Sequence, residues 1–302
     1  MAQPIVCPVC GVNKATKCFE KEGCTFVQCL NDQLVYINPQ PERETLQSVY
    51  DQYGEQIFLL PGKRAATADY PAYRKQFLTF RQTNRLLEMG TATGGFLVRC
   101  RNDGWNTYGV ELSVPSSTFA REHHGLDVFT GTVHDARYPS EFFDVVVAWQ
   151  TLEHVPNPRE VVTEVFRVLR PDGLFVMSVP CWKGLSIRLL KKRYRYVGRD
   201  HLFYFSPNNL QEMLADVGFV RINCKTGGFN PVVCYQDVRG VPKAKNGRGD
   251  METQECEARV TQWKKRSLVR IIHGIYYRIV ERLDLGDTLF AEARKAKCQG
   301  PS

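Results

Sequence analysis

Two acidic residues and a glycine-rich turn, close together in the sequence, could hold a nucleotide-like ligand. The turn from Gly90 to Gly94 follows an apolar run containing Glu88 and precedes a helical pattern. Glycine allows the backbone to bend tightly and to approach a ligand closely. Glu111 ends the next apolar run, 21 residues after Gly90, where a carboxylate can accept hydrogen bonds from two ribose hydroxyls. Dinucleotide-binding enzymes share this pattern, so the turn alone does not identify the ligand.

A third polar segment follows the most apolar run of this region. Residues 143–148 predict a strand buried on both faces, and Gln150 to Leu152 come directly after it. Because open α/β sheets bind ligands at the carboxyl ends of their strands, we expect this segment to lie near the glycine-rich turn. His154 and His201 are candidate general bases, since histidine exchanges protons near neutral pH. His154 could instead cap the following helix or fix the loop.

Alternating strands and helices are expected to position these residues. Strands are predicted at 85–89, 107–111, 126–130, 143–148, 174–179, 219–224 and 287–294, and helices at 95–102, 116–123, 157–169 and 207–217. A turn at 170–173 is expected to separate one helix from the fifth strand. This alternation predicts an α/β fold of the Rossmann-like, doubly wound type, with a mostly parallel seven-stranded sheet.

Taken together, these segments resemble the class I S-adenosylmethionine-dependent methyltransferase family, and more narrowly its bacterial group with an LEHV-x-x-P loop. The resemblance covers about residues 80–226 and adds the closing strand. It implies that S-adenosylmethionine is the cofactor. The implied cofactor-binding residues are Glu88, Gly90, Thr91, Gly94, Glu111, Leu112, Asp135, Ala136, Gln150 and Leu152. The family usually has glycine where this chain has Ala92, and we expect the added methyl group to weaken cofactor binding.

The resemblance also assigns roles within this set. The turn from Gly90 to Gly94 would cradle the methionine part of the cofactor, with Glu88 near its ammonium group. Glu111 would hold the ribose, Asp135 and Ala136 the adenine, and Gln150 to Leu152 would line the methyl-transfer side. His201 lies in a segment similar to the family's HL-x-x-F-S motif, which borders the acceptor pocket. We therefore prefer His201 to His154 as the catalytic base.

The N-terminal cysteines predict a small metal-binding module. Cys7 and Cys10 form a CxxC knuckle, which brings two thiolates onto one metal ion, as in zinc ribbons. Relatives in the resembled family often carry a second knuckle before a Leu-Val-x-x-Asn-Pro run. Here Cys29 fills its first position, and Asp32 stands where the fourth cysteine would be. Cys24 is a rival fourth ligand, and a ribbon that no longer binds metal is the alternative.

Length and composition indicate one large domain with an appendage. The chain has 302 residues, of which 43% are hydrophobic and 24% charged, as expected for a globular protein. We expect a zinc-ribbon-like β module at 1–41, a helical connector or lid at 42–80, and a methyltransferase domain at 81–302 with a basic helical insertion at about 239–286. The absence of a signal-peptide pattern and of a long apolar run, together with an odd number of cysteines, predicts a cytoplasmic protein.

The net charge of +8 is concentrated in two segments. Residues 183–199 hold seven basic and no acidic residues, and residues 259–282 hold seven basic and one acidic residue. The first segment could grip a phosphate on a substrate. The second could lie on an anionic membrane surface, which would place the protein peripherally at the inner membrane. The alternative for the second segment is a solvated helix whose apolar stripe covers the sheet.

The expected activity is methyl transfer to a small, anionic acceptor: a phosphate-bearing sugar, a glycan precursor or a secondary metabolite. An oxygen acceptor is preferred over carbon or nitrogen. One alternative is a catalytically silent binding protein, which Ala92 and the incomplete ribbon suggest. Another is an RNA methyltransferase, but residues 148–151 lack an Asn-Pro-Pro-Tyr-type loop, so we do not expect a nucleic-acid partner. An oxidoreductase that uses NAD fits least.

Overall fold

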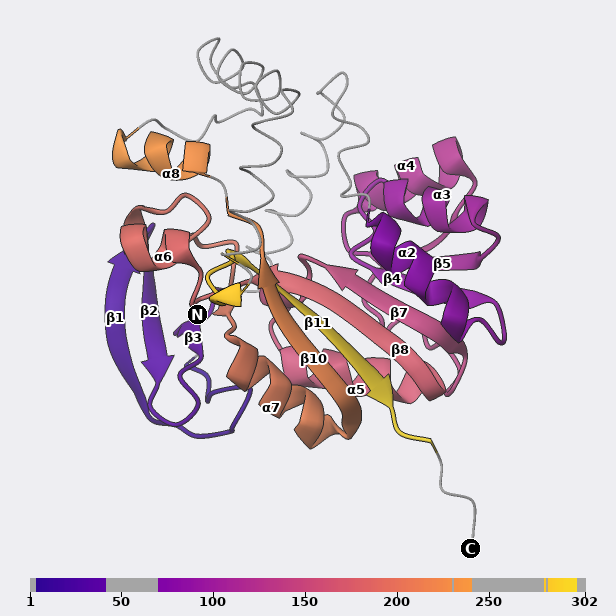
Figure 1. Ribbon diagram of the computed structural model, residues 1–302, viewed down its shortest axis with the longest axis horizontal. Helices are drawn as coiled ribbons and strands as arrows, with labels where there is room; N and C mark the ends of the chain where they lie inside the picture. Colours follow the sequence, from indigo (N-terminus) through magenta and orange to yellow (C-terminus); the bar gives the residue numbers. More distant parts are fainter. Residues whose placement is uncertain (1–3, 42–69, 230, 241–279, 281, 298–302) are drawn as a thin grey trace, which may run out of the picture.

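The computed structural model describes residues 4–41, 70–229, 231–240, 280 and 282–297, which build two β-sheets (Figure 1). The strands are β1 Ala15–Lys21, β2 Cys24–Cys29, β3 Val35–Ile37, β4 Arg85–Met89, β5 Asn106–Glu111, β6 Asp127–Thr130, β7 Phe143–Trp149, β8 Leu169–Pro180, β9 Phe203–Tyr204, β10 Phe219–Gly227 and β11 Thr288–Lys295. The α-helices are α2 Pro71–Phe77, α3 Gly95–Asn102, α4 Val114–His124, α5 Pro158–Val168, α6 Leu185–Leu190, α7 Pro207–Val217 and α8 Pro231–Val238. Short 3-10 helices are η1 Leu78–Phe80, η2 Leu152–His154 and η3 Lys191–Arg193.

The large sheet has seven strands in the order β10-β11-β8-β7-β4-β5-β6. The pairs from β8 to β6 are parallel, and β11 is antiparallel to both of its neighbours, β8 and β10. The predicted Rossmann-like α/β fold with a mostly parallel seven-stranded sheet is confirmed, as is a small antiparallel sheet at the N-terminus.

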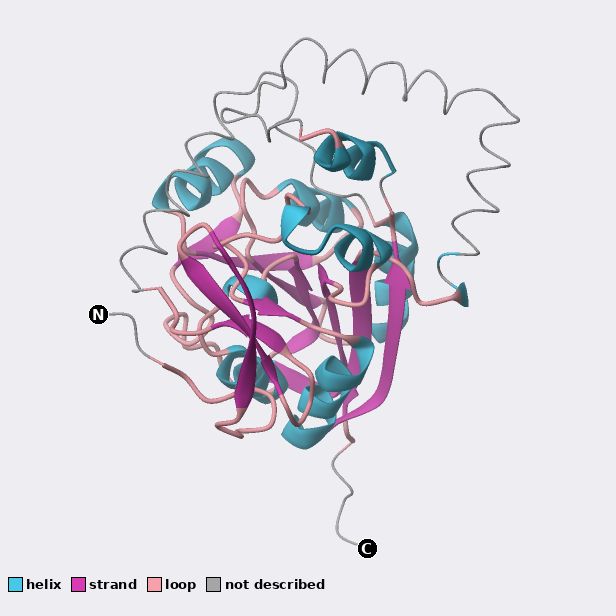
Figure 2. Ribbon diagram, turned by 90° about the vertical axis from the view of Figure 1, so that its left-hand side faces the viewer, coloured by secondary structure: helices cyan, strands magenta, loops and turns pink. Residues whose placement is uncertain are grey.

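Helices cover both faces of the large sheet, as the turned view in Figure 2 illustrates. Neighbouring strand residues point to opposite faces. In β4, Leu86 joins a buried cluster with residues of α2, α3 and α4, whereas Leu87 joins a second cluster with residues of α5 and α7. Val145 and Val146 of β7 divide in the same way. This two-sided burial explains why the central strands are almost wholly apolar.

The region after α5 differs from the prediction. A turn at 170–173 was expected before the fifth strand, but β8 begins at Leu169 and runs without a break to Pro180. Asp172 has a φ of +61° within it, and the pairing with β7 shifts register between Phe143 and Val145. Between these pairs β7 has one residue and β8 has four, so the turn residues 170–173 form a large bulge inside the strand.

The small sheet has the order β1-β2-β3-β9, with antiparallel pairs throughout. Its last strand comes from a distant part of the chain, since Val35 pairs with Tyr204 and Tyr36 with Phe203. The predicted division at 1–41, 42–80 and 81–302 stays a prediction. Residues 42–69 and most of the predicted insertion lie outside the described residues, and α2 and η1 belong to the end of the predicted connector.

None of the helices in the described ranges is both long enough and apolar enough to cross a membrane.

Candidate active site and metal centre

The glycine-rich turn joins β4 to α3 in a conformation that glycine favours. Gly90 has a φ of +68°, and Gly94, which precedes the first residue of α3, has a φ of +84°. A Cβ atom on Gly90 would lie 2.5 Å from Oγ1 of Thr151, and one on Gly94 would lie 2.4 Å from Cδ1 of Leu126. Both positions therefore need glycine for their backbone angles and for space.

Glu111 connects this turn to the end of β5. Its Oε2 accepts a hydrogen bond from the backbone N–H of Ala92 at 2.8 Å, and its Oε1 accepts one from Ser113 at 2.8 Å. Ala92 has a φ of +48°, a left-handed conformation that is costly for residues with a Cβ atom. The carboxylate thus lies against the middle of the turn, at the position expected for a ribose-binding group.

Glu88 is the most deeply buried acidic residue at the turn. Its side chain is 1% exposed, and its Oε2 has no hydrogen-bond partner among the residues that the structure describes. Burial and the neighbouring Glu111 raise the pKa of Glu88 well above its usual value, and Arg99 opposes the rise. A buried carboxylate is costly unless a cation or a donor compensates it. The ammonium group of S-adenosylmethionine is both a cation and a hydrogen-bond donor, which are the partners that Glu88 lacks at Oε2. The residues therefore fit the cofactor.

The loop after β6 lies beside Glu111. The backbone N–H of Gly131 donates to the carbonyl of Glu111 at 2.9 Å. Asp135 accepts hydrogen bonds through Oδ2 from the backbone N–H and the hydroxyl of Thr132, at 3.1 and 2.6 Å. Asp135 is exposed, and Ala136 and Leu112 are half-buried. The structure therefore brings the expected ribose and adenine segments to one edge of the sheet, and their binding roles stay predictions.

The segment after β7 packs on the same edge. The hydroxyl of Thr151 donates to the carbonyl of Met89 at 3.1 Å, and the backbone N–H of Gln150 donates to the carbonyl of Ser178 at 2.8 Å. Leu152 is buried, whereas Gln150 is exposed. Thr151 also sits where a side chain on Gly90 would go. The predicted methyl-transfer side therefore adjoins the glycine-rich turn.

Aromatic side chains whose role the sequence did not specify pack over this edge. The rings of Tyr70 and Trp149 stack with their centroids 4.1 Å apart, and Tyr73 and Phe290 complete the group. Burial raises the pKa of Tyr70, a hydrogen bond with Ser178 lowers it, and Glu88 raises it. The only signal in the sequence was the aromatic-rich composition of the predicted connector.

The two candidate bases lie together. The rings of His154 and His201 meet edge to face, with centroids 4.8 Å apart, and His201 is 8% exposed. Nδ1 of His154 lies 2.6 Å from the backbone carbonyl of Asp200. Burial lowers the pKa of His154, and the Asp200 carbonyl opposes this effect. The net lowering favours the neutral imidazole, which is the form that can accept a proton.

Glu153 lies beside these histidines, and the LEHV motif alone does not indicate that this residue is buried. It is fully buried, and burial raises its pKa to about 8. Its Oε1 lies 3.8 Å from Nε2 of His154. A buried acidic side chain at the carboxyl end of β7 was therefore missing from the predicted site.

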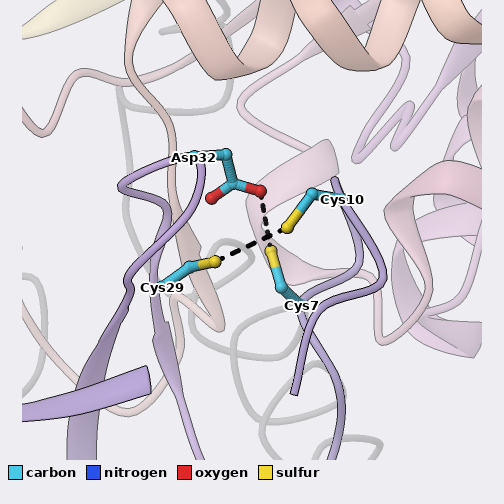
Figure 3. A group of neighbouring side chains, drawn as sticks. All are labelled: Cys7, Cys10, Cys29 and Asp32. Carbon is cyan, nitrogen blue, oxygen red and sulfur yellow. Dashed lines mark hydrogen bonds between the residues drawn. The ribbon is translucent and has the colours of Figure 1, made fainter. Parts of the chain in front are cut away.

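The four predicted metal ligands come together at the N-terminus (Figure 3). One donor atom from each of Cys7, Cys10, Cys29 and Asp32 lies within 4.8 Å of the others, and Figure 3 shows the side chains pointing toward one another. Sγ of Cys7 donates to Oδ2 of Asp32 at 2.9 Å, and Sγ of Cys10 lies 3.5 Å from Sγ of Cys29. The donor set suits zinc, which accepts thiolate and carboxylate ligands.

Backbone contacts shape this cluster. The N–H of Asn31 donates to Sγ of Cys29 at 3.4 Å, and the N–H of Leu34 donates to Oδ1 of Asp32 at 2.8 Å. The rival ligand Cys24 begins β2, whereas Cys29 ends it. A strand rises about 3.4 Å per residue, so these two cysteines lie roughly 17 Å apart. The structure therefore places Asp32, and not Cys24, beside the other three.

The basic segment 183–199 follows β8 at the carboxyl edge of the large sheet. Arg195 pairs with Asp237 of α8 through an Nε–Oδ1 contact of 2.6 Å, so its charge is already balanced by this carboxylate. The exposed basic residues are Lys183, Arg188, Lys191, Lys192, Arg193 and Arg199. In the second basic segment, residues 259–279 and 281 lie outside the described residues. The predicted membrane contact and cytoplasmic location thus stay predictions.

Comparison with known proteins agrees with this architecture. The family model for a methyltransferase domain matches residues 63–222. The ubiquinone biosynthesis O-methyltransferase of Psychrobacter arcticus is 26% identical over an alignment of 163 residues, which covers 49% of this chain and 63% of that protein. The chain thus spans less than two thirds of the length of this relative.

Two solved structures share the fold. The S-adenosylmethionine-dependent methyltransferase of Thermotoga maritima, described as a possible histamine N-methyltransferase, has a TM-score of 0.51 and 18% identity, over 83% of this chain and 98% of that one. The [4+2]-cyclase SpnF has a TM-score of 0.54 and 17% identity, over 85% and 98%. Because proteins described by different reactions share this fold, the fold alone does not fix the reaction. The family match covers more than half of the chain, and the chain belongs to the methyltransferase-domain family of S-adenosylmethionine-dependent enzymes.

Proposed function

We propose that this methyltransferase acts on a hydroxyl group of a small anionic molecule. The main support for this proposal is the arrangement at one edge of the sheet. There the turn around Gly90 adjoins the loop that bears His154, and His201 packs beside His154. Bound S-adenosylmethionine supplies a methyl group that is already electrophilic. The protein then has to align the acceptor and remove its proton.

The placement of the side chains supports the cofactor-contacting roles that the resemblance implies. Glu88 would accept a hydrogen bond from the ammonium group, which would compensate its buried charge. Glu111 would exchange its bond to the Ala92 N–H for bonds to the ribose hydroxyls, or share its oxygens between them. Asp135 and Ala136 would border the adenine.

The acceptor proposal rests on charge and on the candidate bases. The exposed cations of α6 and η3, among them Arg188, Lys191 and Lys192, follow directly after β8. The N–H of Trp182 donates to the carbonyl of Phe205 at 2.8 Å, which ties the residue before this segment to the residue after β9. Exposed cations in a segment that is tied to the chain after His201 suit a phosphate or carboxylate on the acceptor. A relative named as an O-methyltransferase supports an oxygen acceptor.

The test compares matched acceptors. The purified chain would be incubated with S-adenosylmethionine and pairs of sugars or phenols with and without a phosphate group, and products would be detected by mass spectrometry. We expect a methyl ether on phosphate-bearing members and a higher KM, by tenfold or more, for the Arg188→Ala/Lys192→Ala variant. Products methylated on nitrogen or carbon, or equal rates with uncharged partners, would contradict the proposal.

We also propose that Cys7, Cys10, Cys29 and Asp32 bind one structural zinc ion. A closed four-ligand set with thiolates is typical of structural zinc sites. The measurement is zinc per chain by mass spectrometry in the wild type and in Cys29→Ser, with the exposed Cys18→Ser as the matched control. We expect zinc to be lost only in Cys29→Ser. Zinc that is absent from the wild type and the control alike would refute this.

A further inference from the structure

A second group of possible metal ligands lies on the acceptor side. Glu153 and His154 come from η2, and His201 comes from the loop before β9. One donor atom from each lies within 4.8 Å of the other two. Two imidazoles and one carboxylate form the donor set of many protein sites for Zn²⁺ and Fe²⁺. The group is separate from the cysteine cluster.

Glu153 supplies an independent observation. Its side chain is fully buried, and neither carboxylate oxygen accepts a hydrogen bond from another residue in the described part of the chain. Removing a carboxylate from water without a partner costs several kcal/mol. Folded proteins compensate such groups with a cation or a donor. A metal ion beside Glu153 would provide that compensation.

The orientation of His154 matches that of a metal ligand. Its Nδ1 lies 2.6 Å from the backbone carbonyl of Asp200, which fixes the proton on Nδ1. The other nitrogen, Nε2, then carries the lone pair and lies 3.8 Å from Oε1 of Glu153. Metal-bound histidines usually donate their second N–H to a carbonyl or carboxylate in this way.

Backbone pairing holds the two loops in register. The N–H of Leu202, next to His201, donates to the carbonyl of Glu153 at 2.8 Å. This bond keeps His201 beside η2, because it fixes the backbone on both sides of the cluster. The three donors are therefore held by η2 and by the loop that leads into β9.

We propose that Glu153, His154 and His201 bind one divalent transition-metal ion, for which zinc is the best match. Three protein ligands leave a coordination position open, as in catalytic zinc sites. A hydroxyl of the acceptor would occupy it, and the ion would lower the hydroxyl pKa so that its proton passes to water. The oxygen would then form a bond to the methyl carbon as the carbon–sulfur bond breaks. In this role the two histidines act as ligands of the metal ion and not themselves as the bases. The role rests on the proposed function, whereas metal binding does not.

The test uses Mn²⁺ as a probe, because soft thiolate sites disfavour it. The full chain would be titrated with Mn²⁺, and free Mn²⁺ would be counted by its paramagnetic resonance signal without any acceptor. We expect about one bound ion per chain, with affinity at least tenfold weaker in Glu153→Gln and in His201→Gln. Cys29→Ser, measured well below its unfolding temperature, and the exposed-histidine control His134→Asn should bind like the wild type.

The stability of the variants separates metal loss from misfolding. Without a metal ion, Glu153→Gln replaces a buried carboxyl group that has no partner by a neutral amide of the same size, so its Tm in chelator should equal or exceed that of the wild type. Added Mn²⁺, which the cysteine cluster disfavours, should then raise the Tm of the wild type and not that of Glu153→Gln. Failure of Mn²⁺ to bind the wild type, or equal binding by Glu153→Gln and His201→Gln, would overturn the proposal. An inactive chain that still binds Mn²⁺ would count only against the proposed acceptor chemistry.

Discussion

Ala92 lies in the middle of the glycine-rich turn, and its φ of +48° is a backbone conformation that glycine adopts more readily than alanine. A left-handed conformation costs a residue with a Cβ about 1–2 kcal/mol. Glycine would relieve this strain, although its greater freedom in the unfolded chain costs about 0.5–1 kcal/mol. The two effects on stability nearly cancel.

We therefore expect Ala92→Gly to change ligand affinity more than stability. Removing the methyl group from the cradle should tighten binding of S-adenosylhomocysteine by roughly three- to tenfold, which is about 1 kcal/mol. Gly90→Ala is the reciprocal change, and it should weaken binding because its Cβ would lie 2.5 Å from Thr151 Oγ1. Titration calorimetry measures both. Equal affinities for wild type and Ala92→Gly would show that the methyl group does not crowd the ligand.

Glu88 allows a second prediction, in which stability and binding change in opposite directions. Glu88→Gln removes a buried charge that lacks a partner at Oε2, so the ligand-free protein should unfold at a higher temperature. The same change removes a charge-assisted hydrogen bond to the ammonium group, worth about 1.5–3 kcal/mol, so affinity should fall by about 10- to 100-fold. Thermal unfolding and calorimetry test the pair. A Tm that falls together with affinity would indicate a structural role for the carboxylate.

At the scale of the elements, the sequence predicts the bounds of helices and strands where neighbouring residues in the chain determine them. The predicted bounds of β4 and α3 match the structure, because the glycines of the turn end one element and begin the next. The two-residue strand β9 could not be predicted, since only its pairing with the distant β3 defines it. Glu153 was missed for a related reason: its burial and its neighbour His201 depend on the packing of two loops that are far apart in sequence.

A buried ion pair between Asp144 and Arg170 lies at the start of β7, and it is the basis of a third prediction. Asp144 accepts hydrogen bonds from Arg170 at 2.5 Å and from the backbone N–H groups of Gln82, Thr83 and Asn84. Burial alone would raise its pKa, but these donors lower it below the usual value. Its lowered pKa in the folded state adds stability above the unfolded-state pKa of about 3.9, and this contribution is lost as the pH falls toward the folded pKa.

Asp144→Asn should therefore destabilise the protein most at neutral pH. Removing one partner of a buried pair costs about 3–5 kcal/mol, and the Arg170 charge would remain buried. Urea unfolding at pH 7 should show this loss, and the difference from the wild type should shrink as the pH approaches 3. The exposed Asp216→Asn, whose partner Arg159 is also partly exposed, should change little. A difference that does not depend on pH would exclude the ionised carboxylate as the source.

At the scale of the whole molecule, hydrogen bonds and one strand pairing join the N-terminal sheet to the methyltransferase fold. The main-chain carbonyl of Asp32 accepts a hydrogen bond from Asn209 of α7 at 3.3 Å, and that of Pro8 accepts one from Arg159 of α5 at 3.2 Å. The pairing of β3 with β9 adds a third connection, directly after His201 and Leu202. The cysteine cluster is thus linked to two helices that cover the large sheet and to the loop carrying a candidate base.

The fourth prediction is that removing metal from the cysteine cluster weakens the entire fold. If the small sheet melted by itself, β9 would lose its partner and the buried Phe203 and Tyr204 would lose their cover. We therefore expect Cys29→Ser to unfold in a single transition shifted down by roughly 10 °C, given that domains of this size shift by about 2–4 °C per kcal/mol. Scanning calorimetry measures the shift, with Cys18→Ser as control. An unchanged main transition preceded by a small early one would instead mean that the cysteine module folds independently. His201 would then keep its position after the cysteine module had unfolded.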